Sequence, residues 1–404
     1  MAKLFIEDLA GQNGLGVKGK RVITRVDFNV PLKDGKVESD KRLRESLPTI
    51  RFLIKSGAKT ILMSHLGRPK GVTESLRMAP VAKALSLLLD KTVQTVSDCV
   101  GPEVIAAVAA MKEGDVLLLE NLRFHAEEEA NEVEFAKSLA ALADIYVNDA
   151  FGSAHRAHAS TEGITHFISK NVAGYLMKKE LDFLGGALDQ PKRPFVSIIG
   201  GAKISGKIDV IEALLPKVDK LLIGGGMAYT FLKALGFEIG KSLVENDKIE
   251  LAKALLARGG DKIQLPVDYM VTDMLDFKGR KLGSLKAVSR DGIPADMESV
   301  DIGPKSAELF SSIVKGAKTV VWNGPMGVFE IKESAAGTFA VAQALVEATT
   351  KGAVTIIGGG DSAAAIEQLG LADQVSHVST GGGASLEFLE GKVLPGVNAL
   401  TEKA

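Results

Sequence analysis

Short apolar runs alternate along the chain with longer segments in which apolar residues recur at helical spacing. In the first half the predicted strands cover residues 21–28, 60–64, 92–96, 116–119 and 144–148. In the second half they cover residues 194–199, 220–223, 263–265, 319–322, 353–357 and 375–378. The runs are nearly continuous in Val, Ile and Leu, which is typical of parallel sheets covered by helices on both faces. The sequence therefore predicts an α/β protein with two parallel sheets, each flanked by helices.

Helical spacing is clear in residues 44–56, 79–89, 248–257 and 337–349. A further helical segment, residues 173–189, lies between the halves and is predicted to end near Gly185 and Gly186. A helix with a Gly/Pro exit suits a connector between domains. At 404 residues the chain is long for one domain, so two are expected. We predict a first domain over residues 1–172, a helical hinge over 173–190 and a second domain over 191–385.

The overall composition bears on two questions: whether the protein binds a nucleic acid or a membrane, and in which compartment it is found. The formal net charge is -1, which gives no long-range reason to expect a nucleic acid or a membrane as partner. No uninterrupted apolar stretch reaches membrane-spanning length. The sole cysteine, Cys99, cannot form an intramolecular disulfide, and the segment after Met1 becomes acidic too early for a secretory signal. We therefore expect a cytoplasmic protein, and we interpret Cys99 as a packed bystander.

Cationic side chains gather where the predicted strands of the first half end. They are Arg25, Arg42, His65, Arg68, Arg123, His155, Arg156 and His158. Ligands of open α/β sheets bind outside the carboxyl ends of the strands, and a guanidinium group matches phosphate and carboxylate, so this half is predicted to bind a small anion. Asp27 and Asn29 lie on the same side of the chain as Arg25, so they can accept hydrogen bonds from hydroxyl groups of the same ligand. Any one arginine could instead be a surface ion-pair partner, and His155 with His158 could ligate zinc only with further ligands that the sequence does not identify.

Glycine runs take the same positions in the second half, at residues 224–226, 358–360 and 381–383. Glycine lets the backbone approach a phosphate, and a helix N-terminus adds free N–H groups, so this half is predicted to bind a nucleotide. Residues 201–208 nearly spell a P-loop, but Ile208 replaces the hydroxyl residue that the motif requires. Asp361 follows the second run and is either a ligand of nucleotide-bound magnesium or a helix cap.

Eight segments resemble the phosphoglycerate kinase family in order and spacing. They are residues 25–31, 64–69, 120–124, 148–156, 200–203, 322–330, 358–361 and 379–385. The resemblance spans nearly the whole chain. It implies two Rossmann-like domains joined by a helical hinge, with residues 386–404 returning to the first domain. It also implies reversible phosphoryl transfer between ATP and 3-phosphoglycerate, giving ADP and 1,3-bisphosphoglycerate, with Mg²⁺ bound alongside the nucleotide. We expect a monomer.

The resemblance also assigns residues to two sites. The glycerate ligand is implied to contact Asp27, Phe28, Asn29, Arg42, His65, Leu66, Gly67, Arg68, Arg123 and Arg156, with Arg25 in support. The nucleotide is implied to contact Lys203, Lys207, Gly224, Gly225, Asn323, Glu330, Gly359, Gly360, Asp361 and Ser362. Within that set the family places Glu330 at the ribose, Gly224 and Gly225 at the adenine, and Asp361 at the magnesium ion.

The chemistry of such a transfer is simple for the protein. A carboxylate attacks the γ-phosphorus in line, and because it is already ionised no general base is required, so catalysis reduces to positioning and charge neutralisation. We assign Arg42, Lys207 and the amides of Gly381, Gly382 and Gly383 to the transferring group. Hinge closure is expected when both ligands are bound. Two other classes stay open: a dinucleotide oxidoreductase, whose glycine fingerprint is not cleanly matched, and a silent binding or scaffold protein.

Overall fold

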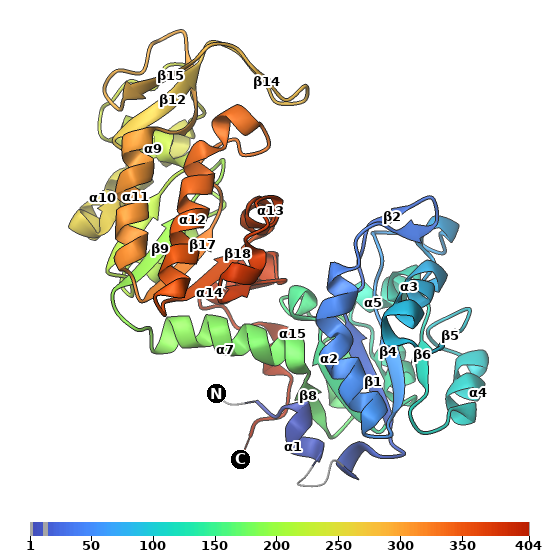
Figure 1. The fold of residues 1–404 in the computed structure, drawn as a ribbon. Helices are drawn as coiled ribbons and strands as arrows, with labels where there is room; N and C mark the ends of the chain where they lie inside the picture. Colours follow the sequence, from blue (N-terminus) through green and yellow to red (C-terminus); the bar gives the residue numbers. More distant parts are fainter. Residues whose placement is uncertain (1–2, 11–14, 404) are drawn as a thin grey trace. The chain divides into compact units, whose positions relative to one another are not determined.

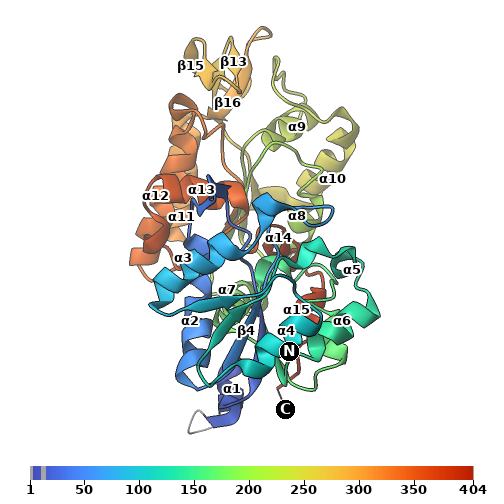
Figure 2. The ribbon, with the colours of Figure 1, turned by 90° about the vertical axis from the view of Figure 1, so that its right-hand side faces the viewer.

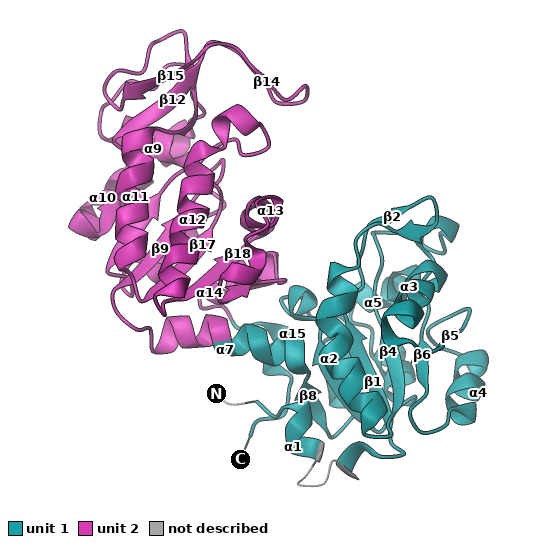
Figure 3. Cartoon of the chain, viewed as in Figure 1, with its two compact units in different colours: residues 1–182, 393–404 teal, residues 183–392 magenta. Residues whose placement is uncertain are grey.

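The protein is described by a computed structural model, in which residues 3–10 and 15–403 are placed. The chain forms two compact units, residues 1–182 with 393–404 (unit 1) and residues 183–392 (unit 2), coloured separately in Figure 3. The division between them falls inside helix α7, Tyr175–Asp189. Because α7 continues through Gly185 and Gly186, the predicted helix end near these glycines is wrong. Ala173, predicted to begin the connector, instead ends strand β8.

Unit 1 is built on a parallel sheet of six described strands in the order β5-β6-β4-β1-β7-β8. The strands are β1 Arg21–Val26, β4 Lys59–Met63, β5 Val93–Thr95, β6 Val116–Leu118, β7 Ile145–Asp149 and β8 Asn171–Ala173. The helices are α1 Ile6–Ala10, α2 Lys41–Lys55, α3 Ala79–Leu89, α4 Pro102–Ala110, α5 Ala126–Glu129, α6 Val133–Ala140 and α15 Pro395–Asn398. Figure 2 shows α2 and α3 on one side of this sheet and α5 and α6 on the other. Side chains on both faces of the central strands are buried, which explains their continuous apolar runs.

The C-terminal residues of the described chain pack on unit 1. The Leu4 amide donates to the Thr401 carbonyl at 2.8 Å, and Lys3 and Glu402 form an antiparallel bridge. Further along, the Gly396 amide donates to the Ala154 carbonyl at 2.8 Å. Leu4 and Thr401 also form backbone hydrogen bonds with Ala173 and Asn171, so both end segments of the described chain lie against strand β8 (Figure 1).

Unit 2 repeats the plan, with the described strands ordered β11-β10-β9-β17-β18-β19 in a second parallel sheet of six. They are β9 Phe195–Ile199, β10 Lys220–Ile223, β11 Ile263–Gln264, β17 Thr319–Asn323, β18 Val354–Gly358 and β19 His377–Val378. The helices are α8 Ile208–Leu214, α9 Met227–Ala234, α10 Ile249–Gly259, α11 Pro304–Gly316, α12 Ala336–Thr350, α13 Gly360–Gln368 and α14 Gly383–Leu389. In Figure 1 α11 and α12 lie side by side over one face of this sheet. The prediction of two parallel sheets flanked by helices is confirmed.

Three antiparallel elements of the described chain were not predicted. Strands β12 Asp268–Thr272, β15 Leu285–Ser289 and β16 Glu298–Ile302 form a three-stranded sheet in unit 2, and β13 Leu275–Asp276 pairs with β14 Lys281–Leu282 as a hairpin. In unit 1, β2 Leu32–Lys33 and β3 Lys36–Val37 form a second short hairpin. The hairpin strands were not predicted because they have two residues each, and β15 was not predicted because it is largely exposed. Strands β12 and β16 are mostly buried, but charged and polar residues interrupt their apolar runs. Among the described residues no helix is long and apolar enough to cross a membrane.

Candidate functional site

In unit 1 the predicted anion-binding residues come from four neighbouring strands of one sheet, β6, β4, β1 and β7. Asp27 and Asn29 follow β1, His65 and Arg68 follow β4, and Arg123 lies in the turn after β6. Carboxyl ends of adjacent parallel strands share one edge, so this topology brings separate stretches of sequence together. The edge carries both the cations and the polar groups that orient them.

Arg42, at the start of α2, forms an ion pair with Asp27, its Nη1 lying 2.5 Å from Asp27 Oδ2. Burial raises the pKa of Asp27, but the charges of Arg42 and Arg25 outweigh that effect and hold the pKa below its ordinary value. Asp27 is therefore a carboxylate at neutral pH. Since the Arg42 side chain is still 39% exposed, Asp27 orients a guanidinium group that can also meet a ligand.

A second set of contacts joins the loops after β1, β4 and β6. Asn29 Oδ1 accepts from the Gly67 amide at 2.9 Å, and Arg123 Nη1 donates to the Gly67 carbonyl at 2.8 Å. Gly67 has a left-handed backbone (φ +65°), and a Cβ there would lie 2.9 Å from Leu76 Cδ1. The loop therefore needs glycine for its conformation and for close packing.

The remaining predicted residues of this site divide by burial. Arg68 and Arg156 are exposed, so their guanidinium groups are accessible to a ligand. Phe28 and Leu66 lie in the apolar core, where they anchor the two loops rather than offer polar contacts. Arg25 is 1% exposed, and its guanidinium nitrogens bond to Ser160 Oγ, the Val26 carbonyl and His65 Nδ1. Arg25 thus supports the site from beneath.

The zinc hypothesis for the histidine pair gains no support. In residues 3–10 and 15–403, one group of three side chains has the spacing of metal ligands, and it consists of Asp98, Cys99 and His125. His155 and His158 are not part of it. Cys99 is buried, and burial raises the pKa of its thiol, which agrees with its interpretation as a packed bystander.

In unit 2 each of the predicted glycine runs leads from a strand into a helix. Residues 224–226 connect β10 to α9, residues 358–360 connect β18 to α13, and residues 381–383 connect β19 to α14. The residues at the three N-caps are themselves glycines, Gly226, Gly359 and Gly382. Helix N-termini expose N–H groups, and the absence of side chains leaves these groups open to an anion. Some amides of these runs are already used internally: Gly381 N donates to Ser379 Oγ at 3.1 Å, and the amides of Gly224 and Gly225 donate to the carbonyls of Ile199 and Met326 at 2.9 Å each.

Between these turns lies Asn323, at the end of β17. Its Oδ1 accepts from Lys207 Nζ, and Lys207 is the N-cap residue of α8. Burial lowers the pKa of Lys207, while the carboxylates of Asp361 and Glu390 oppose that shift. Asn323 is 1% exposed, and among the described residues its Nδ2 has no hydrogen-bond partner. A buried donor without a partner is costly, so this amide is suited to an acceptor oxygen supplied by a ligand.

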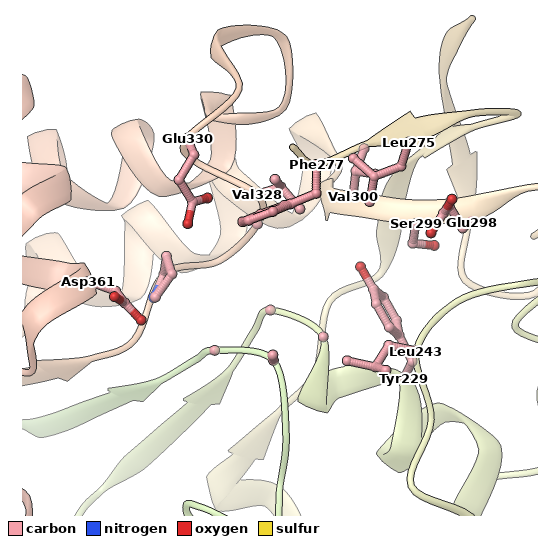
Figure 4. Close-up of a pocket in the computed structure, with 16 residues that line it drawn as sticks. Tyr229, Leu243, Leu275, Phe277, Glu298, Ser299, Val300, Val328, Glu330 and Asp361 are labelled. Atoms are coloured by element: carbon pink, nitrogen blue, oxygen red, sulfur yellow. The ribbon is translucent and has the colours of Figure 1, made fainter. Parts of the chain in front are cut away.

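A cavity of about 290 Å³ opens beside these turns, and Figure 4 shows the residues around it. Its lining combines glycine-rich backbone, apolar side chains and three acidic groups: Gly201, Ala202, Gly225, Gly226, Tyr229, Leu243, Leu275, Phe277, Glu298, Ser299, Val300, Pro325, Gly327, Val328, Glu330 and Asp361. In the figure Asp361 lies at one end of the view, Glu298 and Ser299 lie at the other, and Glu330 comes from above. Apolar walls with a few polar groups suit a nucleoside.

The other predicted nucleotide residues take different places. Lys203 is exposed four residues before Lys207. Gly224 is buried, and a Cβ there would lie 2.4 Å from Met326 Sδ, so Gly224 shapes the turn without lining the cavity. Ser362 is buried as well, and its Oγ accepts from the Gly324 amide at 2.6 Å. Gly360 is exposed in the first turn of α13.

Asp361 has the properties of a metal ligand. Helix α13 begins at Gly360 and its N-cap is Gly359, so Asp361 is not the cap. Its carboxylate is exposed and lines the cavity. Magnesium prefers one or two carboxylates together with phosphate oxygens and water, so this donor set fits a magnesium–nucleotide complex.

Sequence reasoning missed several groups that build these sites. In unit 1 Asn121 Oδ1 accepts from the amides of Leu66 and Arg123, at 3.1 Å each, and thereby couples two ligand-facing loops. A polar pair, Glu120 and Asn121, directly after a buried strand was the available signal. In unit 2 Phe277 reaches the cavity from the β13–β14 hairpin, which the periodicity did not predict.

Comparison with known proteins agrees with this geometry. The profile of the phosphoglycerate kinase family matches residues 13–392. A phosphoglycerate kinase of Chloroherpeton thalassium is 59% identical over 95% of this chain and 96% of its own, and one of Chlorobium chlorochromatii is 57% identical over 99% and 100%. Among solved structures, the phosphoglycerate kinase of Coxiella burnetii is 40% identical to this chain, with a TM-score of 0.88. The phosphoglycerate kinase of Pyrococcus horikoshii is 35% identical, with a TM-score of 0.82. Each comparison covers 98% of both chains. The chain belongs to the phosphoglycerate kinase family.

Proposed function

We propose that the residues described above carry out the family's reaction, reversible phosphoryl transfer between ATP and the carboxylate of 3-phosphoglycerate. The products are ADP and 1,3-bisphosphoglycerate. The observation that supports this most directly concerns Asn323. Its Oδ1 accepts a hydrogen bond from Lys207, and its buried Nδ2, beside Gly358 and Gly359, has no acceptor among the described residues. Such an arrangement suits a phosphate chain.

In unit 1, Arg68, Arg123 and Arg156 bind the anionic ends of the glycerate ligand, and Asn29 contacts its polar groups. Arg42 has the further task of neutralising the transferring phosphoryl group, supported by its ion pair with Asp27. The nucleophile is a carboxylate, so the site needs no general base. Its contribution is to hold that carboxylate for in-line attack and to balance charge that moves during transfer.

In unit 2, Lys207 and the amides of the glycine runs at 358–360 and 381–383 bind nucleotide phosphates, and Glu330 accepts from ribose hydroxyls. Asp361 would hold Mg²⁺, which supplies charge neutralisation at the phosphate oxygens. The apolar lining around Tyr229 and Val328 receives the base. We further propose a monomer, and a location in the cytoplasm that is supported by the sole cysteine, which is buried and cannot form an intramolecular disulfide.

A coupled assay that follows ADP release from ATP tests this proposal. Turnover should require 3-phosphoglycerate and magnesium together. Release of ADP without the acceptor would mean hydrolysis, and an absorbance change of added nicotinamide cofactor with substrate alone would instead support the oxidoreductase. A purified protein that binds both ligands but shows no turnover would be a silent binding protein.

A further inference from the structure

Behind the anion-binding edge of unit 1 lies a row of polar groups outside the proposed ligand contacts. Glu128 is 1% exposed and Ser160 is fully buried, although both are polar. Ser160 Oγ donates to Glu128 Oε1 at 2.5 Å, and the Ser160 amide donates to Glu128 Oε2 at 2.9 Å. Arg25 Nε donates to the same Ser160 Oγ at 2.8 Å. Burial of so many polar groups is costly unless each has a task or a partner.

The direction of every hydrogen bond in this row is determined. A guanidinium group only donates, and a serine hydroxyl has one proton. Arg25 therefore donates to Ser160, and Ser160 gives its proton to Glu128. Burial raises the pKa of Glu128 above its ordinary value, and the charge of Arg25 and the two hydrogen bonds from Ser160 offset only part of that shift. Both carboxylate oxygens accept, so Glu128 is the counter-charge of the buried Arg25.

The other end of Arg25 faces His65, with Nη2 3.0 Å from His65 Nδ1. Because Nη2 can only donate, Nδ1 must be the acceptor and carries no proton. The ring proton then resides on Nε2. A protonated ring would place two N–H donors against each other at this contact.

We propose that Glu128 and Ser160, acting through Arg25, hold His65 as the neutral tautomer protonated on Nε2, so that it donates one hydrogen bond to an oxygen of the anionic ligand. Glu128, Ser160 and Arg25 are positioning residues, and His65 touches the ligand. Only the identity of that ligand, 3-phosphoglycerate, rests on the proposed function.

The charges around the ring agree with a neutral imidazole. Arg25, Asp27, Arg123 and Arg42 face it from β1, the loop after β1, the turn after β6 and α2, so three cations oppose one carboxylate. Burial and the Arg25 charge lower the pKa of His65 to about 3. His65 therefore adds a donor without adding charge, unlike the arginines of the same edge.

Long-range ¹H–¹⁵N spectra of the histidine rings test the proposal in the free enzyme, without substrate. Wild-type His65 should show a protonated Nε2 and an unprotonated Nδ1, unchanged between about pH 6 and pH 8. Arg25→Met removes the donor and should yield mixed tautomers, a ring that titrates nearer its ordinary pKa, and about tenfold weaker 3-phosphoglycerate binding. Ser160→Ala should shift the same signals by a smaller amount.

Arg21→Met is the matched control, since Arg21 lies on the same strand and is paired with Asp144 at the surface. It should leave the His65 signals unchanged. A proton on Nδ1, an imidazolium at neutral pH, or an Arg25→Met protein with wild-type ring signals would overturn the proposal. The wild-type spectrum decides even if Arg25→Met does not fold. Loss of turnover with the predicted spectrum intact would count against the proposed function instead.

Discussion

Unit 1 and unit 2 have sheets of the same size and type, yet they prepare to bind anions in different ways. In unit 1 the anion is bound mainly by side chains, and a second layer of polar groups, the half-buried Asp27 and the buried Asn121 and Glu128, orients the cations. In unit 2 much of the anion binding is assigned to the backbone, at glycine turns that lead into helices. Ligand binding should therefore be most sensitive to removal of a side chain in unit 1 and to addition of a side chain at a glycine in unit 2.

The largest effect is expected from Arg42. Replacing Arg42 by Ala or Lys should lower kcat by about 100- to 1000-fold and change ligand affinities much less, because its charge is placed against the transferring group. Steady-state kinetics with both substrates varied measure this split. A near-normal kcat with a raised KM would mean that Arg42 binds the ground state only.

Gly225 tests the backbone strategy of unit 2. It has φ +67°, and a Cβ would lie 2.6 Å from both the nitrogen and the oxygen of Gly201. Gly225→Ala should therefore lower the free energy of unfolding by about 3 kcal/mol and weaken nucleotide binding. Gly206→Ala is the control, since no described atom lies within 4 Å of its Cβ position. Equal denaturation midpoints for the two variants would refute the clash.

Asp361→Ala should weaken binding of magnesium–ADP by about tenfold, since one carboxylate ligand is lost while the phosphate contacts remain. Binding of 3-phosphoglycerate should not change. Calorimetric titration with ADP, with and without magnesium, separates the contribution of the metal ligand from that of the phosphate contacts. An affinity for magnesium–ADP equal to that of the wild type would remove Asp361 from the metal site.

A smaller effect concerns the pH dependence of stability, because each unit buries an aspartate whose pKa is raised to about 7. Burial raises the pKa of Asp149 in unit 1 and of Asp301 in unit 2 to about 7. The folded state then binds more protons than the unfolded state between about pH 4 and pH 7, so both groups make stability fall as pH rises through that window. Asp149→Asn should flatten part of this slope in chemical denaturation, and a slope as steep as that of the wild type would contradict the assignment.

Much of the fold could be predicted because parallel strands buried on both faces leave continuous apolar runs, as in 319–323. The roles of Arg42, Lys207 and Asp361 were reachable from position and from resemblance to a family, and they stay proposals that the experiments above test. The antiparallel strands around residues 268–302 could not be predicted from the sequence pattern, since β15, for example, is largely exposed and its pattern resembles that of a loop.

The sequence by itself determined which chemistry was present: arginines at the strand ends of one half, glycines at those of the other, and motifs specific enough to indicate the family. Only the tertiary structure decided which of these groups face a ligand. Arg25 and Arg68 look alike in sequence, yet Arg25 is buried against Ser160 and His65 while Arg68 is exposed. The reason is that hydrogen-bond partners 40 and 135 residues from Arg25 are brought to it by sheet order, which local patterns do not encode.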